Sequence, residues 1–130
     1  MKILLTGCAG FIGFHTTIKI LKKNYTVIGI DNLNNYYDVN LKKERLKILK
    51  KYSNFIFIKV NIENKVKVED IFKKFKPNKI IHLAAQAGVR YSLTNPHAYI
   101  NTNIVGFMNI LDNAKKFKCK HLVYASSSSV

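Results

Sequence analysis

Tryptophan is absent from this 130-residue sequence, and cysteine, proline and acidic residues are scarce. No apolar run approaches the roughly 20 residues that span a bilayer, and the first one is too short and too close to glycine to be a signal peptide. The two cysteines, Cys8 and Cys119, lack metal-ligand spacing and fit a reducing compartment. We therefore expect a cytoplasmic protein with no membrane partner and no metal site.

The chain also lacks a linker rich in glycine, serine or proline, and it contains no internal repeat. Of its 130 residues, 48% are hydrophobic, which is enough to bury a core. Residues 1–130 are therefore expected to form one domain or part of one.

Acidic residues are outnumbered by basic ones, 7 to 22, which gives a formal net charge of +15. Such an excess attracts nucleic acids and other polyanions. However, Arg45 and Arg90 are the only arginines, and no aromatic stacking motif interleaves the lysines. Lys42, Lys47 and Lys73 fall in helical patterns and are expected on solvated faces. The sequence predicts no specific nucleic-acid partner.

Strand-like apolar runs alternate with helical patterns along the whole chain. This alternation predicts an α/β fold with a Rossmann-like, doubly wound parallel sheet that stops after about five strands. The expected strands are residues 3–5, 27–30, 55–60, 80–83 and 122–125. Two helical sets are expected in the core: Val68, Ile71, Phe72 and Phe75, and in the longest helix Ile100, Ile104, Phe107, Leu111 and Ala114. An N-cap at Asn95 before Pro96 and a helix stop at residues 76–78 are also predicted.

Three glycines at three-residue intervals, Gly7, Gly10 and Gly13, follow the first expected strand and open a helical pattern. A strand, a tight turn and a helix start together let backbone N–H groups hold a pyrophosphate. Gly7 suits the turn, Gly10 the close approach of the phosphates, and Gly13 the close packing of helix and strand. A glycine-rich loop without a ligand is the alternative if nothing else agrees.

The second expected strand ends at Asp31, about 20 residues beyond the glycines. In dinucleotide-binding proteins a carboxylate at this place accepts hydrogen bonds from the adenosine ribose. Its charge would repel the 2′-phosphate of NADP, and residues 32–35 offer no Arg or Lys to hold that phosphate. The pattern favours NAD as cofactor, although an Asp at a strand end is often only a turn or cap residue.

Four consecutive serines, residues 126–129, follow the fifth expected strand. They could form a tail. Their position at the carboxyl end of a parallel strand favours a ligand site, because open α/β sheets bind ligands at that edge.

The sequence resembles the extended short-chain dehydrogenase/reductases, the NAD-dependent epimerases and dehydratases, and among them the UDP-glucuronate 4-epimerases. Residues 6–13, 31–38, 82–92 and 124–130 carry the resemblance; the first segment marks the superfamily only, whereas residues 31–38 and 82–92 are more specific to the uronate epimerases. The resemblance implies that NAD⁺ takes hydride from C4 of a UDP-hexuronate and returns it to the opposite face of a 4-keto intermediate, which converts UDP-glucuronate to UDP-galacturonate. It also implies a homodimeric parent protein, because relatives commonly dimerise.

The resemblance further implies roles for individual residues. Ser127 would hydrogen-bond the sugar O4 as a catalytic residue, and Arg90, Ser128 and Ser129 would contact substrate, although Arg90 could equally be structural. Asn103 is an alternative to Thr102 at the nicotinamide, and either could instead make a buried polar contact. The implied cofactor contacts are Gly7, Gly10, Phe11, Ile12, Gly13, Asp31, Asn32, Asn35, Asn61, Ile62, Leu83, Ala84, Ala85, Gln86 and Thr102. His82 is expected to be a strand-end histidine satisfied by backbone partners.

The chain departs from the family pattern in two ways. Asn61 stands where the family usually has an Asp that contacts adenine, and its carbonyl could still accept that hydrogen bond. More importantly, no Tyr has a Lys four positions later, so the catalytic base is absent. We therefore expect an N-terminal fragment, an incomplete NAD(P)-binding Rossmann domain that is inactive alone. Alternatives for the parent are another NAD-dependent nucleotide-sugar dehydratase or decarboxylase, or a non-catalytic NAD-binding module.

Overall fold

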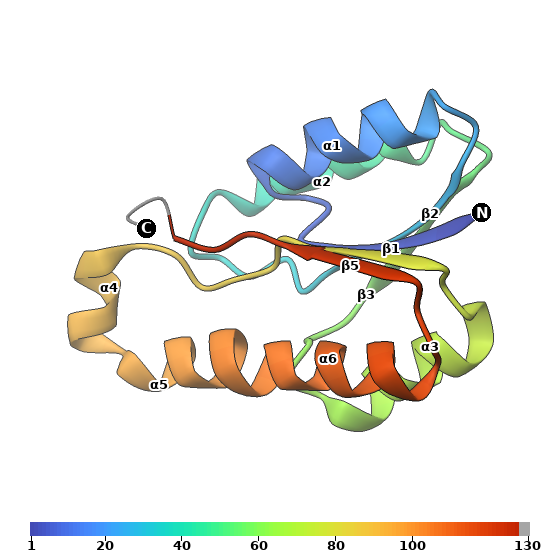
Figure 1. The fold of residues 1–130 in the computed structure, drawn as a ribbon. Coiled ribbons are helices and arrows are strands. Elements are labelled where there is room, and N and C mark those ends of the chain that lie inside the picture. Colours follow the sequence, from blue (N-terminus) through green and yellow to red (C-terminus); the bar gives the residue numbers. More distant parts are fainter. Residues whose placement is uncertain (128–130) are drawn as a thin grey trace.

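The computed structural model describes residues 1–127, which form a five-stranded parallel sheet between two layers of helices (Figure 1). The strand order is β3-β2-β1-β4-β5. The strands are β1 (Lys2–Thr6), β2 (Thr26–Asp31), β3 (Phe55–Lys59), β4 (Lys79–His82) and β5 (His121–Tyr124). The order reverses between β1 and β4, which leaves a crevice at their carboxyl ends. The predicted doubly wound sheet is confirmed.

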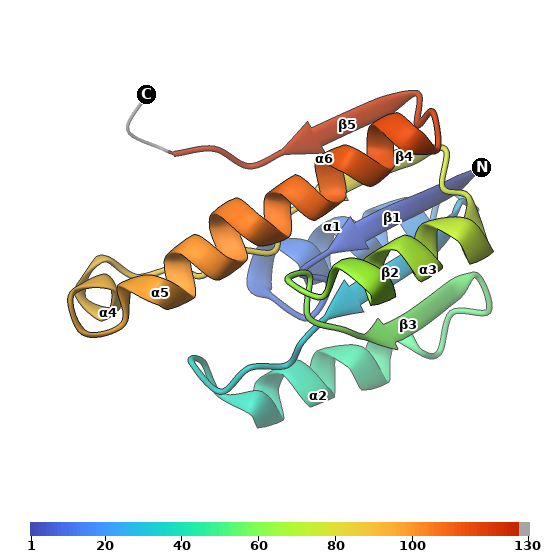
Figure 2. The ribbon, with the colours of Figure 1, turned by 90° about the horizontal axis from the view of Figure 1, so that it is seen from below.

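Helices cover both faces of this sheet. α1 (Phe11–Leu21) and α2 (Val39–Leu49) lie on one face, and α3 (Lys65–Phe75) and α6 (Phe107–Lys116) lie on the other (Figures 1 and 2). α4 (Val89–Thr94), α5 (Pro96–Tyr99) and the π-helix η1 (Ile100–Gly106) connect β4 to α6. No helix within residues 1–127 has the length and hydropathy that a membrane span requires.

The core consists of two clusters, one on each face of the sheet. Leu4 packs with Phe72 and Ile110 beneath α3 and α6, whereas the next residue, Leu5, packs with Leu49 beneath α1 and α2. Successive side chains of a strand point to opposite faces, and both faces are covered here. This explains why the central strands are apolar throughout.

Local signals at two helix ends are confirmed. The Asn95 side chain accepts a hydrogen bond from the Ala98 N–H, and Pro96 begins α5. At the predicted helix stop, Lys76 adopts a left-handed backbone conformation with φ 46°, and α3 ends there. The Asn95 cap satisfies an N–H group that the first helical turn would otherwise leave open.

The predicted core face of the longest helix is wrong in part. Phe107 and Ala114 pack against the core, but Ile100, Ile104 and Leu111 are exposed. The π-helical segment, whose bonds run from i to i+5, inserts an extra residue and changes which side chains face the sheet. The buried positions are Gly106, Asn109, Ile110 and Asn113.

A hydrophobicity pattern does not predict the burial of Asn109, because that burial depends on partners that are distant in the sequence. Its side-chain amide donates to the carbonyl oxygens of Ile62 at 2.9 Å and Glu63 at 3.1 Å. A buried amide is tolerated when such partners exist, and they lie 46 and 47 residues away in sequence. α6 is thereby attached to the segment after β3.

Candidate cofactor-binding site

The turn between β1 and α1 has no room for a side chain at Gly7, and the α1 residue that packs against it, Gly13, has none either. Gly7 has φ +74°, and its N–H donates to the Ile30 carbonyl oxygen at 2.8 Å. A Cβ on Gly13 would lie 1.9 Å from the Gly7 carbonyl oxygen. Gly10 precedes the first turn of α1, and among the described residues no side chain caps it. The N–H groups of that turn are therefore left for a ligand, as in anion sites at helix starts.

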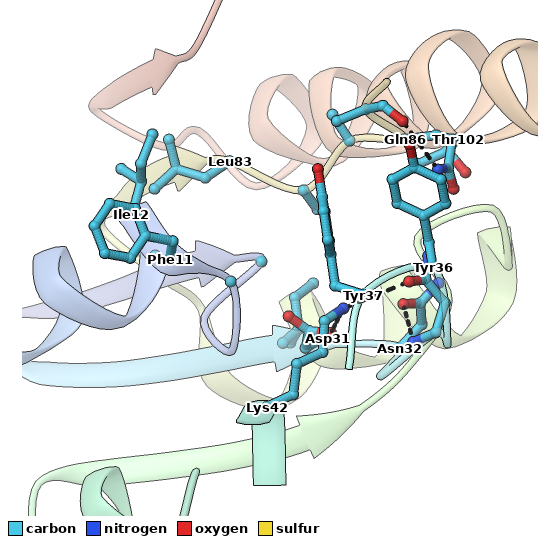
Figure 3. A pocket seen from close by; sticks show the side chains of 18 of the residues that line it. Phe11, Ile12, Asp31, Asn32, Tyr36, Tyr37, Lys42, Leu83, Gln86 and Thr102 are labelled. Carbon is cyan, nitrogen blue, oxygen red and sulfur yellow. Dashed lines mark hydrogen bonds and ion pairs between the residues drawn. The ribbon is translucent and has the colours of Figure 1, made fainter. Parts of the chain in front are cut away.

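A cavity of about 430 Å³ opens beside this turn at the carboxyl ends of the strands (Figure 3). It is lined by every cofactor contact predicted from the sequence except Asn35 and Asn61. The lining predicted residues are Gly7, Gly10, Phe11, Ile12, Gly13, Asp31, Asn32, Ile62, Leu83, Ala84, Ala85, Gln86 and Thr102. Their convergence agrees with one shared site, while the role of each residue stays a prediction.

Asp31 forms the acidic end of the cavity and is held by three groups. Its Oδ2 accepts from the Ala9 N–H at 3.1 Å, and its Oδ1 accepts from the Leu33 N–H at 2.8 Å. Lys42 Nζ lies 3.6 Å from Oδ1. The prediction that Lys42 belongs to a solvated face is wrong, because its aliphatic stem is buried and its ammonium group is paired with Asp31 (Figure 3).

The two asparagines outside the main cavity have different positions. Asn61 Oδ1 accepts from Asn32 Nδ2 at 3.1 Å, so Asn61 holds a residue that does line the cavity. Asn35 lines an adjoining hollow together with Tyr36 and Gln86. Tyr36 extends from the Asn32 side of the cavity toward Gln86 (Figure 3).

A buried hydroxyl connects the glycine turn to the segment after β4. Thr6 Oγ1 accepts from the N–H groups of Leu83 at 3.0 Å and Ala84 at 2.9 Å. Its proton is therefore available for His82 Nδ1, 2.8 Å away. This assigns the neutral tautomer of His82 with the proton on Nε2, and the ring stacks on Phe107 at 4.9 Å. His82 is satisfied as predicted, but by a hydroxyl and not by backbone.

Burial lowers the pKa of His82 from 6.5 to about 4, because the charged imidazolium is poorly solvated there. Between these values the unfolded state binds a proton that the folded state does not. Stability from this group is thus complete above pH 6.5 and is lost as the pH falls toward 4, by about 3 kcal/mol. Urea unfolding at pH 7 and pH 4.5 should show that loss in the complete protein.

The control for this pH dependence is His82→Asn, whose carbonyl oxygen can still accept from Thr6 but does not titrate. We expect its free energy of unfolding to change less than that of the wild type over the same pH range. Equal pH dependence in both proteins would contradict the assignment to His82.

The long helix supports the cavity through two polar side chains. Asn103 accepts from the Gln86 N–H at 2.9 Å and donates to the Gln86 carbonyl oxygen at 3.1 Å. Thr102 lines the cavity and donates to Glu63 Oε1 at 2.8 Å. Asn103 thus makes a polar contact and is not among the residues that line the cavity, whereas Thr102 combines a polar contact with a place in the cavity wall; a nicotinamide contact of either stays a prediction.

Two of the predicted substrate and catalytic residues, Arg90 and Ser127, belong to the part of the chain that the structure describes. Arg90 is exposed in the first turn of α4, and Ser127 is exposed just beyond β5. Neither is among the residues that line the cavity, although Ala125 is. The predicted contacts of Ser128 and Ser129 lie outside the described residues.

Sequence reasoning missed several residues of the cavity wall. Tyr36 and Tyr37 lie in residues 31–38, the segment that carries part of the family resemblance, but the resemblance assigns them no role. Lys42 and Arg45 lie in α2, where a basic residue is ordinarily solvated, so no local signal distinguishes them from their neighbours. The complete set of lining residues that was missed is Ile30, Asn34, Tyr36, Tyr37, Asp38, Leu41, Lys42, Arg45, Val60, Ala87 and Ala125.

Known proteins are similar to this chain in sequence and in fold. Protein CapI of Staphylococcus aureus is 53% identical over 100% of this chain and 39% of its own length. UDP-glucuronate 4-epimerase of Thermodesulfobacterium geofontis is 48% identical over 98% of this chain and 39% of its own. The crystal structure of Bacillus cereus UDP-glucuronic acid 4-epimerase, in complex with UDP-glucuronic acid and NAD, matches with a TM-score of 0.91 and 35% identity over 100% of this chain and 41% of that one.

The chain thus spans about two fifths of the length of these relatives. The family model for GDP-mannose 4,6-dehydratase matches residues 4–130, nearly the whole sequence. The glycine turn, the acidic end of β2 and the strand order agree with that match. The chain therefore belongs to the GDP-mannose 4,6-dehydratase family of extended short-chain dehydrogenase/reductases, the NAD-dependent epimerases and dehydratases.

Proposed function

We propose that the chain is the NAD-binding portion of a nucleotide-sugar 4-epimerase that converts UDP-glucuronate to UDP-galacturonate. The observation that carries this proposal is the joint position of the glycine turn and Asp31 around one cavity. The two relatives named as UDP-glucuronate 4-epimerases support the choice of sugar. The name of the matching family supports a dehydratase as the competing activity.

The residues present fit NAD. At Gly7 and Gly13 a Cβ would overlap backbone atoms, so these glycines let the turn pack closely and bring the uncapped first turn of α1 to the cavity, where a pyrophosphate can bind. Phe11 and Ile12 would donate their N–H groups there. Asp31 would accept hydrogen bonds from the adenosine ribose, because each of its oxygens keeps acceptor capacity after its backbone contact.

Bound NAD⁺ would supply a hydride acceptor and donor for C4 of the sugar. Ser127 would hold the sugar O4 and assist removal of its proton, and Arg90, Ser128 and Ser129 would contact the substrate. The sequence provides no Tyr with a Lys four residues later, so the phenolate base would come from the remainder of the parent enzyme. We further propose that this parent is a cytoplasmic homodimer and that the fragment alone is inactive.

The test supplies UDP-glucuronate deuterated at C4 to the protein made from its complete coding sequence. NMR should detect UDP-galacturonate with deuterium retained at C4, because the same hydrogen leaves and returns. Ser127→Ala should lower turnover by about 100-fold while NAD remains bound. Absence of the product would refute the epimerase, release of carbon dioxide would identify a decarboxylase, and NAD binding without turnover of any sugar nucleotide would identify a binding module.

A further inference from the structure

The Asp31–Lys42 pair is unusual because it is buried at the edge of the cofactor cavity. The side chain of Lys42 is 10% exposed and that of Asp31 is 5% exposed. Lysine is almost never this buried without a partner. The partner here is Asp31, which is expected to accept hydrogen bonds from the adenosine ribose. Both side chains line the cavity.

The donors and acceptors around this pair leave it open to a ligand. Lys42 Nζ carries three donors; it lies 3.6 Å from Asp31 Oδ1 and donates to Asn34 Oδ1 at 3.5 Å. These two contacts occupy at most two donors. A third can point toward a group bound at the Asp31 carboxylate.

Other charged groups near the pair are already engaged. Arg45 donates through Nη1 to the Ala9 carbonyl oxygen at 3.0 Å, and its guanidinium lies 5.9 Å from the centre of the Phe11 ring. Asp38 caps α2 by accepting from the Asn40 N–H at 2.9 Å. Lys42 is thus the cation in direct contact with the Asp31 carboxylate.

A carboxylate paired with a cation excludes anions less strongly than a lone carboxylate does. In NAD-specific sites the negative charge disfavours the 2′-phosphate of NADP. At Asp31 the adjacent ammonium offsets part of this charge, and at this distance in a partly buried site the offset is substantial. The choice between the two cofactors therefore depends on both members of the pair.

We propose that Lys42 is a specificity-determining residue for the cofactor. Paired with Asp31, it donates to the adenosine ribose beside the carboxylate. Without the Asp31 charge, the same ammonium becomes a counter-ion for a 2′-phosphate. This inference rests on the proposed function, because it assigns a role within the NAD site.

The experiment measures NADH and NADPH binding by cofactor fluorescence in the protein made from its complete coding sequence. Wild type should prefer NADH. Asp31→Asn should shift the ratio of the two dissociation constants toward NADPH by about tenfold or more, and Asp31→Asn with Lys42→Met should reverse most of that shift. Lys42→Met alone should weaken NADPH binding more than NADH binding.

Lys43→Met is the matched control, since Lys43 is the next residue of α2 and is exposed. Combined with Asp31→Asn, it should preserve the gain in NADPH binding. Lys42→Gln, which keeps a donor but no charge, replaces Lys42→Met if thermal melting shows that the methionine variant is unfolded. In Asp31→Asn alone, NADPH binding should weaken with salt more steeply than NADH binding.

Two failures are distinguishable. If the wild type binds neither nucleotide, the proposed function is wrong. If the wild type binds NADH but the NADPH shift of Asp31→Asn is the same with and without Lys42, or shows no greater salt dependence, the role of Lys42 is overturned.

Discussion

Gly13→Ala is expected to destabilise the protein by about 3 kcal/mol and to weaken NAD binding by about 100-fold. The new Cβ would lie 1.9 Å from the carbonyl oxygen of Gly7 and 2.8 Å from its carbonyl carbon. Both are backbone atoms, so no side-chain rotation can relieve the overlap. α1 would have to move away from the β1 turn, and its first N–H groups would leave the phosphate position.

Urea unfolding and NAD titration of the complete protein test this prediction, with Gly10→Ala as the comparison. A Cβ on Gly10 would meet the Gly7 oxygen at 3.2 Å, which a small shift can relieve. Gly10→Ala should therefore retain most of its stability in the absence of NAD while losing NAD affinity. If Gly13→Ala were as stable as Gly10→Ala, the close contact between Gly13 and the Gly7 carbonyl would not be needed for stability, and the prediction would be wrong.

Thr6→Val is expected to cost about 3 kcal/mol of stability, although the two side chains have nearly the same shape. The hydroxyl of Thr6 contacts three groups: the N–H groups of Leu83 and Ala84 and the imidazole of His82. Removing it leaves the Ala84 N–H and His82 Nδ1 without this partner, whereas the Leu83 N–H still donates to the Thr6 carbonyl oxygen at 3.2 Å. Leu83 and Ala84 line the cavity, so NAD binding should weaken as well.

Thr6→Ser is the control, because it keeps the hydroxyl and removes one methyl group. It should cost about 1 kcal/mol from lost apolar burial and leave NAD affinity nearly unchanged. Denaturant unfolding gives the first quantity and NAD titration the second. Equal losses in the valine and serine variants would show that the methyl group, and not the hydroxyl, carries the effect.

The strands, the glycine turn and Asp31 could be predicted because each depends on local sequence. A buried parallel strand is apolar along its length. The turn after β1 has a backbone φ of +74° at residue 7, a conformation that favours glycine. The core face of residues 100–116 could not be predicted in the same way. Asn109 is buried there by partners near residue 62, whereas Ile104 is 63% exposed.

The sequence alone determined the fold class, the glycine turn and the acidic strand end, because the spacing of residues along one βαβ unit fixes these features. Tertiary structure decided which distant groups meet them. Lys42 reaches Asp31, Asn61 holds Asn32, and Thr6 connects to His82 across 76 residues of sequence. These contacts form between neighbouring strands and a returning helix, so no local pattern encodes them.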